Sequence, residues 1–589
     1  MGRTAASPAP AAALAAAVLW VGAAGCAGSR PPLPLRPEPV PLADTLPVPE
    51  PAERDPSEVA RLVEDALWGE LSEPFDLRKW TGTRREALNV TRFDRVVASS
   101  WWRPRIGHRP FGPTAVRRGP TEAGPDTSRT LTVVAGKATG VTPGFTVRDA
   151  RGDRYLLKFD PPGFLHLASA AGVIASRIFW AAGYHVPEDY KIAFEAERLE
   201  VAPDATVSTA AGERSMTRED VRGIMARVDT LPDGRHVALA SALVPGVPKG
   251  PFLFSGVRRD DPNDHYLHQY RRELRGLWVL AAWTNHFDLR FANTLDAYVE
   301  PGYLRHYLID FAGALGSESV GPHRPRDGLE HNFDLWAVVG RLATLGFYRA
   351  GWEGEEAEVI HPSVGWMRVE SFRPTRWTPN WPNEAYRQMT ARDAYWGAKL
   401  VGAFSDRHVR AAVEAGRLPD AAAEDTLVDI LIHRRDRILE HWYGRVTPLE
   451  EPRVEPGAAG RVESAAPDGA GAGAGPPDAA SGFTLTFRDL GLEAGAWSPG
   501  ETRYRWRFAH PARGLEAEGT SGARGGARER VEVRLPRGGG RALEVPGPRE
   551  ALATLRLAAL RPGADGRAAV VHLRWRGPGA GYVAAGLEH

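Results

Sequence analysis

The sequence has 589 residues and a single cysteine, Cys26, so no disulfide can form within the chain and its stability must come from packing. No serine lies in a G-x-S-x-G segment, and the sole thiol is close to the N-terminus, so a nucleophilic hydrolase has no candidate residue. Neither sign of charge dominates, because 74 Lys and Arg residues face 73 Asp and Glu residues. This balance gives no indication of nucleic acid as a partner.

The N-terminus has the pattern of an export signal. An apolar run over residues 11–25 is too short to span a membrane and ends in small side chains. Cys26 follows directly, and the Ala-Gly-Cys ending resembles the bacterial lipoprotein signal, whose cysteine becomes the lipidated first residue. The resemblance implies a signal peptide over residues 1–26 and an exported protein that is lipid-anchored to a bacterial membrane, in the cell envelope or periplasm. The alternative is an Ala-rich terminus with an incidental free cysteine.

Composition divides the remaining chain into segments. Residues 27–56 are rich in proline and lack aromatic residues, which predicts an extended tether. Residues 57–126 are expected to form an N-terminal extension that begins with a short amphipathic helix and wraps over the next domain. Residues 449–481 are expected to be a linker, because most of them are Ala, Gly or Pro. Residues 482–589 alternate polar and apolar residues between Gly and Pro turns, which is typical of a small antiparallel β-sandwich.

Residues 127–448 are predicted to start with strands and to continue mainly as helices. Period-two alternation marks the strands, and apolar residues at helical spacing mark the helices. The expected elements are strands at residues 130–135, 145–149 and 154–159, a helix from Leu167 to about Gly183, an apolar helix at residues 273–283, and further helices near residues 334–345, 391–404, 407–415 and 426–442.

The strongest signal for chemistry lies in the middle of the chain. His286, Asp288 and Asn293 stand at the offsets of the phosphotransfer signature H-x-D-L-x-x-x-N, and Asp310 follows the next apolar strand as in a D-F-G segment. In such a site one Asp accepts a hydroxyl proton, while the Asn and the second Asp hold metal ions that neutralise phosphate charge. The turn residues 300–302 allow the chain to fold back between the two segments. Taken alone, the loop is equally compatible with Asp and Asn residues that merely cap turns.

A glycine-bearing hairpin and a strand lysine lie upstream. Gly136, Lys137 and Gly140 belong to a predicted turn whose backbone amides can approach a phosphate, because glycine has no Cβ. Their spacing is not G-x-G-x-x-G, so by itself the turn indicates only a Gly-rich hairpin. Lys158 ends the apolar strand segment that starts at Tyr155, and it is either an edge residue facing water or a phosphate ligand. Its position downstream of the glycine turn favours the ligand.

Together, these four elements resemble the protein-kinase-like superfamily over residues 127–447. The segment 307–316 is similar to the I-D-F-G-x-x-L-G segment of phosphoinositide-type lipid kinases. The chain is also similar to atypical bacterial kinase-like proteins of the HipA, spore-coat and lipid-kinase types, and to uncharacterised bacterial envelope proteins with RREALNV, SSWW-x-x-RIG, LKFDPP and AAGY-x-VPE segments. The resemblance implies an α+β, two-lobed protein-kinase-like fold, here followed by the C-terminal antiparallel β-sandwich.

The resemblance also implies cofactors and residue roles. The cofactors are Mg²⁺ and ATP or another nucleotide. The implied roles are catalysis by Asp288 and Lys158, nucleotide binding by Gly136, Lys137, Gly140 and Lys158, and metal binding by Asn293 and Asp310; the lipoprotein signal adds lipidation at Cys26.

One departure concerns the partner of the strand lysine. Kinases pair this lysine with a Glu on the following helix, which fixes it against the phosphates. Residues 161–187 contain no acidic residue, and Gly172 stands about where the Glu is expected. Lys158 must therefore use another partner, for which Asp160 is a candidate, or remain unpaired. In addition, Phe287 replaces the Arg of H-R-D, which removes the usual contact to a phosphorylated activation loop.

Two functions therefore stay open. The first is a Mg²⁺-dependent phosphotransferase acting on an unknown protein, lipid or small-molecule acceptor. The second is a pseudokinase that serves as a binding or scaffold lipoprotein in the envelope, which the missing Glu and the exported address favour. Contact with the membrane would come through the N-terminal lipid, and no nucleic acid partner is expected. The histidines His265, His268, His323 and His331 lack H-E-x-x-H spacing and are interpreted as polar loop residues.

Overall fold

The described residues have a mixed α+β fold, as the sequence predicts. The structure is a computed structural model that describes residues 42–54, 85–137, 144–209, 212–318, 320–332, 334–456, 482–535, 551–564, 566–577 and 581–589. The expected signal peptide with Cys26, the helix expected at the start of the N-terminal extension, and Gly140 lie outside the described residues. All described residues belong to one compact unit that spans residues 39–589.

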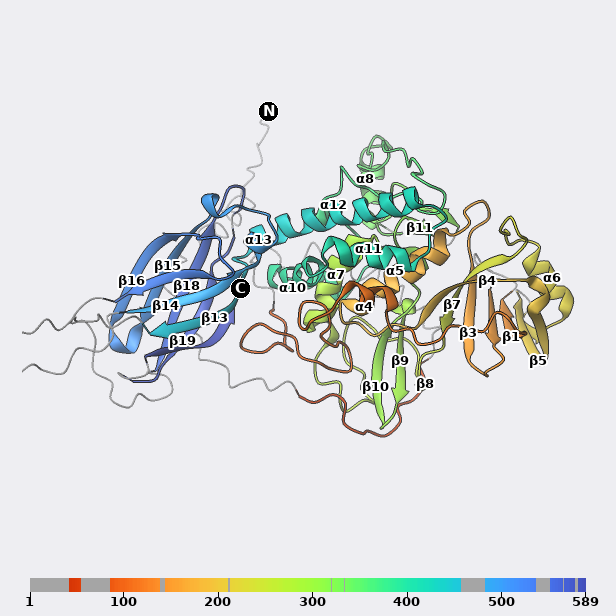
Figure 1. Ribbon diagram of the computed structural model, residues 1–589, viewed down its shortest axis with the longest axis horizontal. Helices are drawn as coiled ribbons and strands as arrows, with labels where there is room; N and C mark the ends of the chain where they lie inside the picture. Colours follow the sequence, from red (N-terminus) through yellow and green to blue (C-terminus); the bar gives the residue numbers. More distant parts are fainter. Residues whose placement is uncertain are drawn as a thin grey trace, which may run out of the picture. The chain divides into compact units, whose positions relative to one another are not determined.

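A seven-stranded sheet forms the first part of the fold (Figure 1). Its order is β4-β7-β3-β2-β1-β5-β6, and all neighbours are antiparallel except β1 and β5, which run parallel. The three strands predicted at its start are confirmed. The strands are β1 (Leu131–Lys137), β2 (Gly144–Arg148), β3 (Arg154–Phe159), β4 (Asp189–Phe194), β5 (Leu199–Thr209), β6 (Gly212–Ser215) and β7 (His236–Ala242).

Helices cover both faces of this sheet. Tyr155, Leu157 and Phe159 of β3 point into an apolar core to which α6 (Arg218–Met225) contributes three buried side chains. Successive side chains of a strand point to opposite faces, so Lys158 lies on the other side. That side is packed against the predicted helix, α5 (Leu167–Ala181), which contacts β3, β4 and β7 and is buried along almost its whole length.

Helices dominate the second part of the fold. The apolar helix predicted before the H-x-D loop is confirmed as α7 (Arg272–Thr284), which is buried throughout and contacts α10 and α12 (Figure 1). A hairpin with a cis Glu300–Pro301 bond follows the loop. The other elements are α4 (Pro113–Arg118), β8 (Val247–Pro248), β9 (Thr294–Val299), β10 (Tyr303–Leu308), β11 (Ser317–Glu318), β12 (Gly321–Pro322), α8 (Leu335–Ala343), α9 (Glu384–Arg387), α10 (Ala391–Gly402), α11 (Asp406–Ala415) and α12 (Ala421–Arg445).

Buried charges join segments that are distant in the sequence. Arg272 lies 2.9 Å from Asp94 and 2.6 Å from Asp393, and Asp94 also contacts His589 at 3.0 Å. Burial favours the neutral form of Asp94, but the guanidinium groups of Arg272 and Arg392 outweigh it and hold the pKa of Asp94 well below its ordinary value. These contacts join the N-terminal extension to α7, α10 and the end of the chain.

The N-terminal extension enters the main apolar core. Trp102 is fully buried, and its Nε1 donates a hydrogen bond to Ala182 O at 2.8 Å. Gly183 has a φ of +115°, and a Cβ there would lie 2.1 Å from Trp102 Nε1. Only glycine fits at this position, because it tolerates the left-handed backbone and leaves room for the indole.

Part of the expected tether also belongs to the folded body. The amide of Val48 donates to Gly302 O at 2.8 Å, and the amide of Arg54 donates to Lys249 O at 3.1 Å. Residues 42–54 are therefore held by backbone hydrogen bonds and do not act as a free spacer.

Two antiparallel sheets share one apolar core at the C-terminus, as the sequence predicts. The expected linker needs a correction at its start, because residues 449–456 form a strand whose Leu449 is fully buried in this core. The three-stranded sheet holds β13 (Leu449–Pro456), β14 (Gly482–Asp489) and β17 (Glu529–Arg534); the five-stranded sheet holds β15 (Arg503–His510), β16 (Leu515–Gly522), β18 (Leu552–Leu560), β19 (Ala569–Trp575) and β20 (Tyr582–Glu588); α13 (Leu490–Glu493) follows β14.

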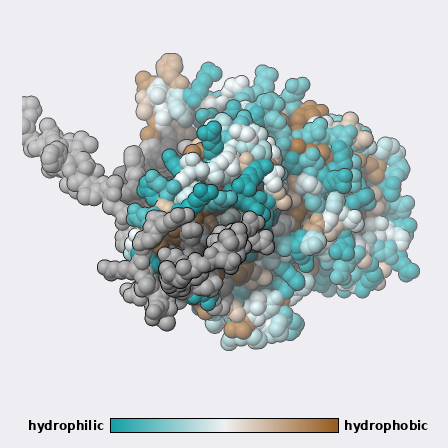
Figure 2. All heavy atoms as spheres, turned by 60° about the vertical axis from the view of Figure 1, so that its left-hand side comes forward, coloured by the Kyte–Doolittle hydropathy of each residue, from teal (hydrophilic) through white to brown (hydrophobic). Residues whose placement is uncertain are grey.

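The surface is largely polar on the face shown in Figure 2, where hydrophilic side chains predominate among the described residues and apolar ones gather in small patches. Among those residues, every helix falls short of the length and apolar character that crossing a membrane requires.

Candidate functional site

The lysine of β3 and the aspartate that follows β10 meet in the folded protein. Lys158 Nζ lies 2.7 Å from Asp310 Oδ1, although 152 positions separate the two residues in the sequence. The two side chains are 25% and 36% exposed, so a ligand from solvent can reach them. Asp310 has a left-handed backbone with φ of +62°, and sparsely populated backbone conformations of this kind cluster at functional sites.

The H-x-D loop holds Asp288 and Asn293 together beside this ion pair. Asn293 Nδ2 donates to Asp288 O at 2.7 Å and to Asp288 Oδ2 at 3.0 Å. The backbone of Asn293 accepts a hydrogen bond from the amide of Ile309 at 3.0 Å, which places Asp310 next to the loop. A Cβ at Gly313 would lie 3.7 Å from Asp288 Cβ, so the segment after Asp310 packs directly on the loop.

Asp288 lies in surroundings that suit a general base. Its carboxylate is 3.3 Å from Arg290 Nε and is hydrogen-bonded by the side chains of Asn293 and Asn380. Burial raises the pKa of Asp288 and the negative charge of Asp310 adds to the effect, whereas Arg290 and the two amides act against it. A carboxylate with a raised pKa accepts a proton more readily near neutral pH.

The pKa of Asp310 is shifted in the opposite direction. Burial disfavours its carboxylate, but the ammonium of Lys158, with smaller help from His286 and Arg290, outweighs burial and holds the pKa of Asp310 below its ordinary value. Two neighbouring carboxylates are thus given different properties. Asp310 stays ionised and is suited to bind cations, while Asp288 is the better proton acceptor.

His286 has the packing role that the sequence predicts. It is buried, with ring centroids 5.5 Å from Phe311 and 5.8 Å from Phe179 of α5. Burial lowers the pKa of His286 to about 4, so the ring is neutral at physiological pH. Phe287, which replaces the Arg of H-R-D, is also buried and packs edge-on against His323 at 4.6 Å.

The structure explains why α5 carries no glutamate for Lys158. A Cβ at Gly172 would lie 2.6 Å from Leu239 Cδ2, and Leu239 is the direct neighbour of Lys158 across β3 and β7. The leucine therefore fills the space that a side chain from this position of α5 would need.

The suggested pairing of Lys158 with Asp160 is wrong. The carboxylate of Asp160 is buried and accepts hydrogen bonds from His166 N at 2.8 Å, Ser169 N at 2.7 Å and Ser169 Oγ at 2.8 Å. These bonds satisfy donors at the start of α5, as a helix cap does. Lys158 is not left unpaired either, because Asp310 is its partner.

The glycine hairpin is only partly described. Gly136 lies within β1 rather than in the turn, paired with Phe145 of β2 on one side and Val207 of β5 on the other. The prediction that Gly136 is a turn residue is therefore wrong, and a Cβ there would lie 2.7 Å from Met216 Cε, so packing explains the glycine. Lys137 ends the strand, and Gly140 lies outside the described residues.

Sequence reasoning missed two polar residues near the site. Asn380 is buried. Its backbone N–H donates to Phe287 O at 2.8 Å, and its side chain hydrogen-bonds Asp288. Asp189 of β4 is buried close enough to Lys158 to feel its charge, and burial raises the pKa of Asp189 to about 6. No spacing rule marks Asn380, whereas an acidic residue at the start of an apolar strand is a usable signal for Asp189.

The oxygen donors of the site fit a magnesium ion. Asp310 offers a carboxylate, and the hydrogen bonds from Asn293 to Asp288 use Nδ2, so they leave the amide oxygen of Asn293 available as a ligand. Within the described ranges, no three His, Cys, Asp or Glu side chains gather as a metal cage. One carboxylate and one amide oxygen suit Mg²⁺, which keeps several waters and uses one or two carboxylates together with substrate phosphates.

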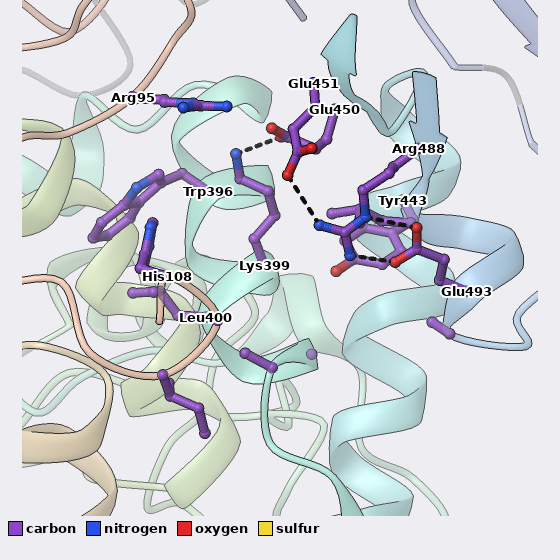
Figure 3. A pocket seen from close by; sticks show the side chains of 16 residues that line it. Arg95, His108, Trp396, Lys399, Leu400, Tyr443, Glu450, Glu451, Arg488 and Glu493 are labelled. Carbon is purple, nitrogen blue, oxygen red and sulfur yellow. Dashed lines mark hydrogen bonds and ion pairs between the residues drawn. The ribbon is translucent and has the colours of Figure 1, made fainter. Parts of the chain in front are cut away.

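A second candidate site is a cavity of about 380 Å³ between α10, α12, the N-terminal extension and the C-terminal strands. In Figure 3, dashed lines join Lys399 and Arg488 to glutamates that line the cavity. Lys399 lies 2.5 Å from Glu450, and Arg488 lies 2.5 Å from Glu493 and 3.4 Å from Glu451. Because opposite charges are matched inside the cavity, it has no net preference for an ion of either sign.

Comparisons with known proteins add little. No family model matches the sequence, and no curated protein matches it. A crystal structure described as the Golgi casein kinase with Mn/ADP bound is similar at 12% sequence identity, with 48% of this chain and 75% of that chain covered. Its TM-score of 0.21 is too low to assign a fold.

Proposed function

We propose that this protein is a kinase-like phosphotransferase that uses Mg²⁺ and ATP or another nucleotide. The observation that carries the proposal is the convergence of four residues from three separate segments, Lys158, Asp288, Asn293 and Asp310, with the contacts described above. The order β1-β2-β3-α5-β4, followed by α7, the H-x-D loop and the β9–β10 hairpin, supports a two-lobed kinase-like fold for residues 127–448.

Each of the four side chains has a role that follows from its surroundings. Asp288 accepts the proton of the acceptor hydroxyl, since its raised pKa and partial exposure suit a base. Asp310 and Asn293 supply the oxygen ligands for Mg²⁺, which neutralises the phosphate charge when bound. Lys158 binds phosphate oxygens. The pair with Asp310 at 2.7 Å uses one of the three ammonium donors of Lys158, so two remain for phosphate oxygens.

The activity can be tested with four forms of the full chain: wild type, Asp288→Asn, Asp310→Asn and the exposed control Asp204→Asn. We expect wild type and the control to form ADP from Mg-ATP. Asp288→Asn should bind Mg-ATP normally but turn over about 10²–10⁴-fold more slowly, which is the usual contribution of a general base. Asp310→Asn should lose Mg²⁺-dependent nucleotide binding. Equal ADP formation by wild type and Asp288→Asn would contradict the proposed base.

A second candidate function is a pseudokinase that binds a partner or ligand as an envelope scaffold. The close contact between Gly172 and Leu239 favours it, because the contact excludes the helix glutamate that active kinases use to position the lysine. Mg²⁺-dependent stabilisation by ATP, lost in Asp310→Asn but without any ADP formation in wild type, would support this function over the first.

We also propose that the protein is exported and anchored through a lipid on Cys26. The support is the apolar run that ends in Ala-Gly-Cys. In bacterial cells, wild-type protein should sediment with membranes and carry a lipid mass on its N-terminal peptide, whereas Cys26→Ser should lose both. Membrane sedimentation of Cys26→Ser equal to wild type would count against the anchor.

A further inference from the structure

A small cavity next to the H-x-D loop has more arginines than acidic residues in its lining. Its volume is about 120 Å³, and four of its lining residues are Arg368, Arg373, Arg376 and Arg434, against Glu355 as the one acidic residue among the described residues that line it. The volume is below the roughly 300–1,000 Å³ of pockets for drug-sized ligands. It suits a compact group, and the excess of positive charge selects an anion.

Arg434 forms the charged floor of this cavity. It is 1% exposed, and it donates to three backbone carbonyls: Ala282 O at 2.5 Å, Trp283 O at 2.9 Å and Arg368 O at 2.5 Å. A guanidinium has five N–H donors, so these three bonds leave two. Burial and the charge of Arg368 lower the pKa of Arg434 to about 9, and it stays protonated at neutral pH.

Of the other three arginines, only Arg368 has a carboxylate partner among the described residues, so most of the positive charge is not balanced. Arg368 is paired with Glu355 at 2.6 Å. Arg373 is exposed and, within the part of the chain that the structure describes, donates only to carbonyls, Glu370 O at 3.1 Å and Phe372 O at 3.0 Å. Arg376 is also exposed, and no ion pair of it occurs within the described residues. Guanidinium groups in such clusters recognise phosphate oxygens through planar, paired hydrogen bonds.

The cavity touches the segment that carries the proposed base. Asn285 lines the cavity and ends α7 in a left-handed conformation, three positions before Asp288. Its side chain is fixed by Trp377 Nε1 at 3.0 Å and by His323 Nδ1 at 2.9 Å. Arg434 binds the last carbonyls of α7, so a ligand on Arg434 acts on the start of the loop.

We propose that this cavity binds a phosphoryl group, supplied either by inorganic phosphate or by a phosphorylated side chain, and that the bound group stiffens the H-x-D loop. The binding step goes beyond the proposed phosphotransferase activity and does not depend on it. Arg373 and Arg376 bind the phosphoryl oxygens at the mouth, and Arg434 supplies charge at the floor.

The test uses the full chain, the double variant Arg373→Gln/Arg376→Gln, and Arg507→Gln as a control for loss of an exposed arginine elsewhere. Both replaced residues at the cavity are exposed, so the variants should fold. Titration calorimetry at constant ionic strength should show that phosphate binds wild type and the control, and that it binds the double variant at least tenfold more weakly. O-phosphoserine is titrated in parallel to represent a phosphorylated side chain.

Outcomes with the two probes separate the two sources. Binding of phosphate supports a free anion as ligand, and binding of O-phosphoserine alone supports a phosphorylated side chain. Binding of neither probe overturns the proposal, as does equal binding by wild type and the double variant.

Hydrogen exchange tests the effect on the loop. In wild type, the bound probe should slow amide exchange several-fold in residues 282–293, with no such change in the double variant. Unchanged exchange in wild type at saturating probe would overturn the stiffening. Neither readout requires ATP turnover, so failure here is distinguishable from failure of the proposed activity.

Discussion

Replacement of Lys158 by methionine separates a ligand-binding role from a structural one. The pair with Asp310 spans 2.7 Å, but its side chains are 25% and 36% exposed. Ion pairs with this exposure contribute about 0–1 kcal/mol, so Lys158→Met should lower the free energy of unfolding by no more than about 1 kcal/mol. The pKa of Asp310 should rise, because Lys158 is the main group that lowers it.

The effect on nucleotide binding should be larger than the effect on the fold. A ligand at 100 times its Kd that binds only the folded chain adds about 2.7 kcal/mol of stability. Loss of a charge-assisted hydrogen bond weakens binding by about 1.5–3 kcal/mol, which is about tenfold or more. At the same Mg-ATP concentration, the stabilisation of Lys158→Met should therefore fall to about 1.4 kcal/mol or less.

The assay is urea unfolding of the full chain with and without Mg-ATP. Arg154→Met is a matched control, because Arg154 is exposed on the same strand and points to the same face as Lys158. Two results would refute the reasoning. One is equal stabilisation of wild type and Lys158→Met by Mg-ATP. The other is a free energy of unfolding without ligand that is more than about 2 kcal/mol lower in Lys158→Met than in wild type, because this exceeds what an exposed ion pair contributes.

Three further predictions concern stability. Gly172→Ala should lower the free energy of unfolding by about 1–3 kcal/mol in urea, because its Cβ would lie 2.6 Å from a buried leucine, and an unchanged midpoint would contradict this packing. Asp94→Ala should lower the free energy of unfolding by about 3–5 kcal/mol in the same assay, because buried arginines lose their partner. The exposed control Asp204→Ala should leave it almost unchanged. Burial lowers the pKa values of His286 and His323 to about 4, so the unfolded chain binds protons at higher pH than the folded chain. Stability should be full above pH 6.5 and fall as the pH drops, by about 2 kcal/mol per histidine at pH 5, and equal urea midpoints at pH 7 and pH 5 would exclude this effect.

Local patterns in the sequence were sufficient for much of the sheet and the site. Period-two alternation located β1, β2 and β3, and helical spacing located α5 and α7. The H-x-D loop and Asp310 could be identified because the motif offsets and the strand between them are both visible in the sequence. The structure brings Asp288, Asn293 and Asp310 together as the motif requires.

The parts that were missed depend on tertiary contacts. The role of Asp160 could not be predicted, because a carboxylate after a strand is equally able to pair with a lysine or to cap a helix. β13 was missed because two prolines and three glutamates mask its alternation. The contact of Asn380 with Asp288 joins positions that are far apart in the sequence, and no local rule applies to such a pair.

The contact between Asp94 and His589 has a consequence for the order of events during biosynthesis. Their positions differ by 495 residues, so the ribosome exposes Asp94 long before its imidazole partner exists. Until then the buried arginines around Asp94 lack one of the groups that surround them in the native state. A nascent chain that stops short of β20 is thus left with an open interior, and we expect chaperones and proteases to act on it during that interval.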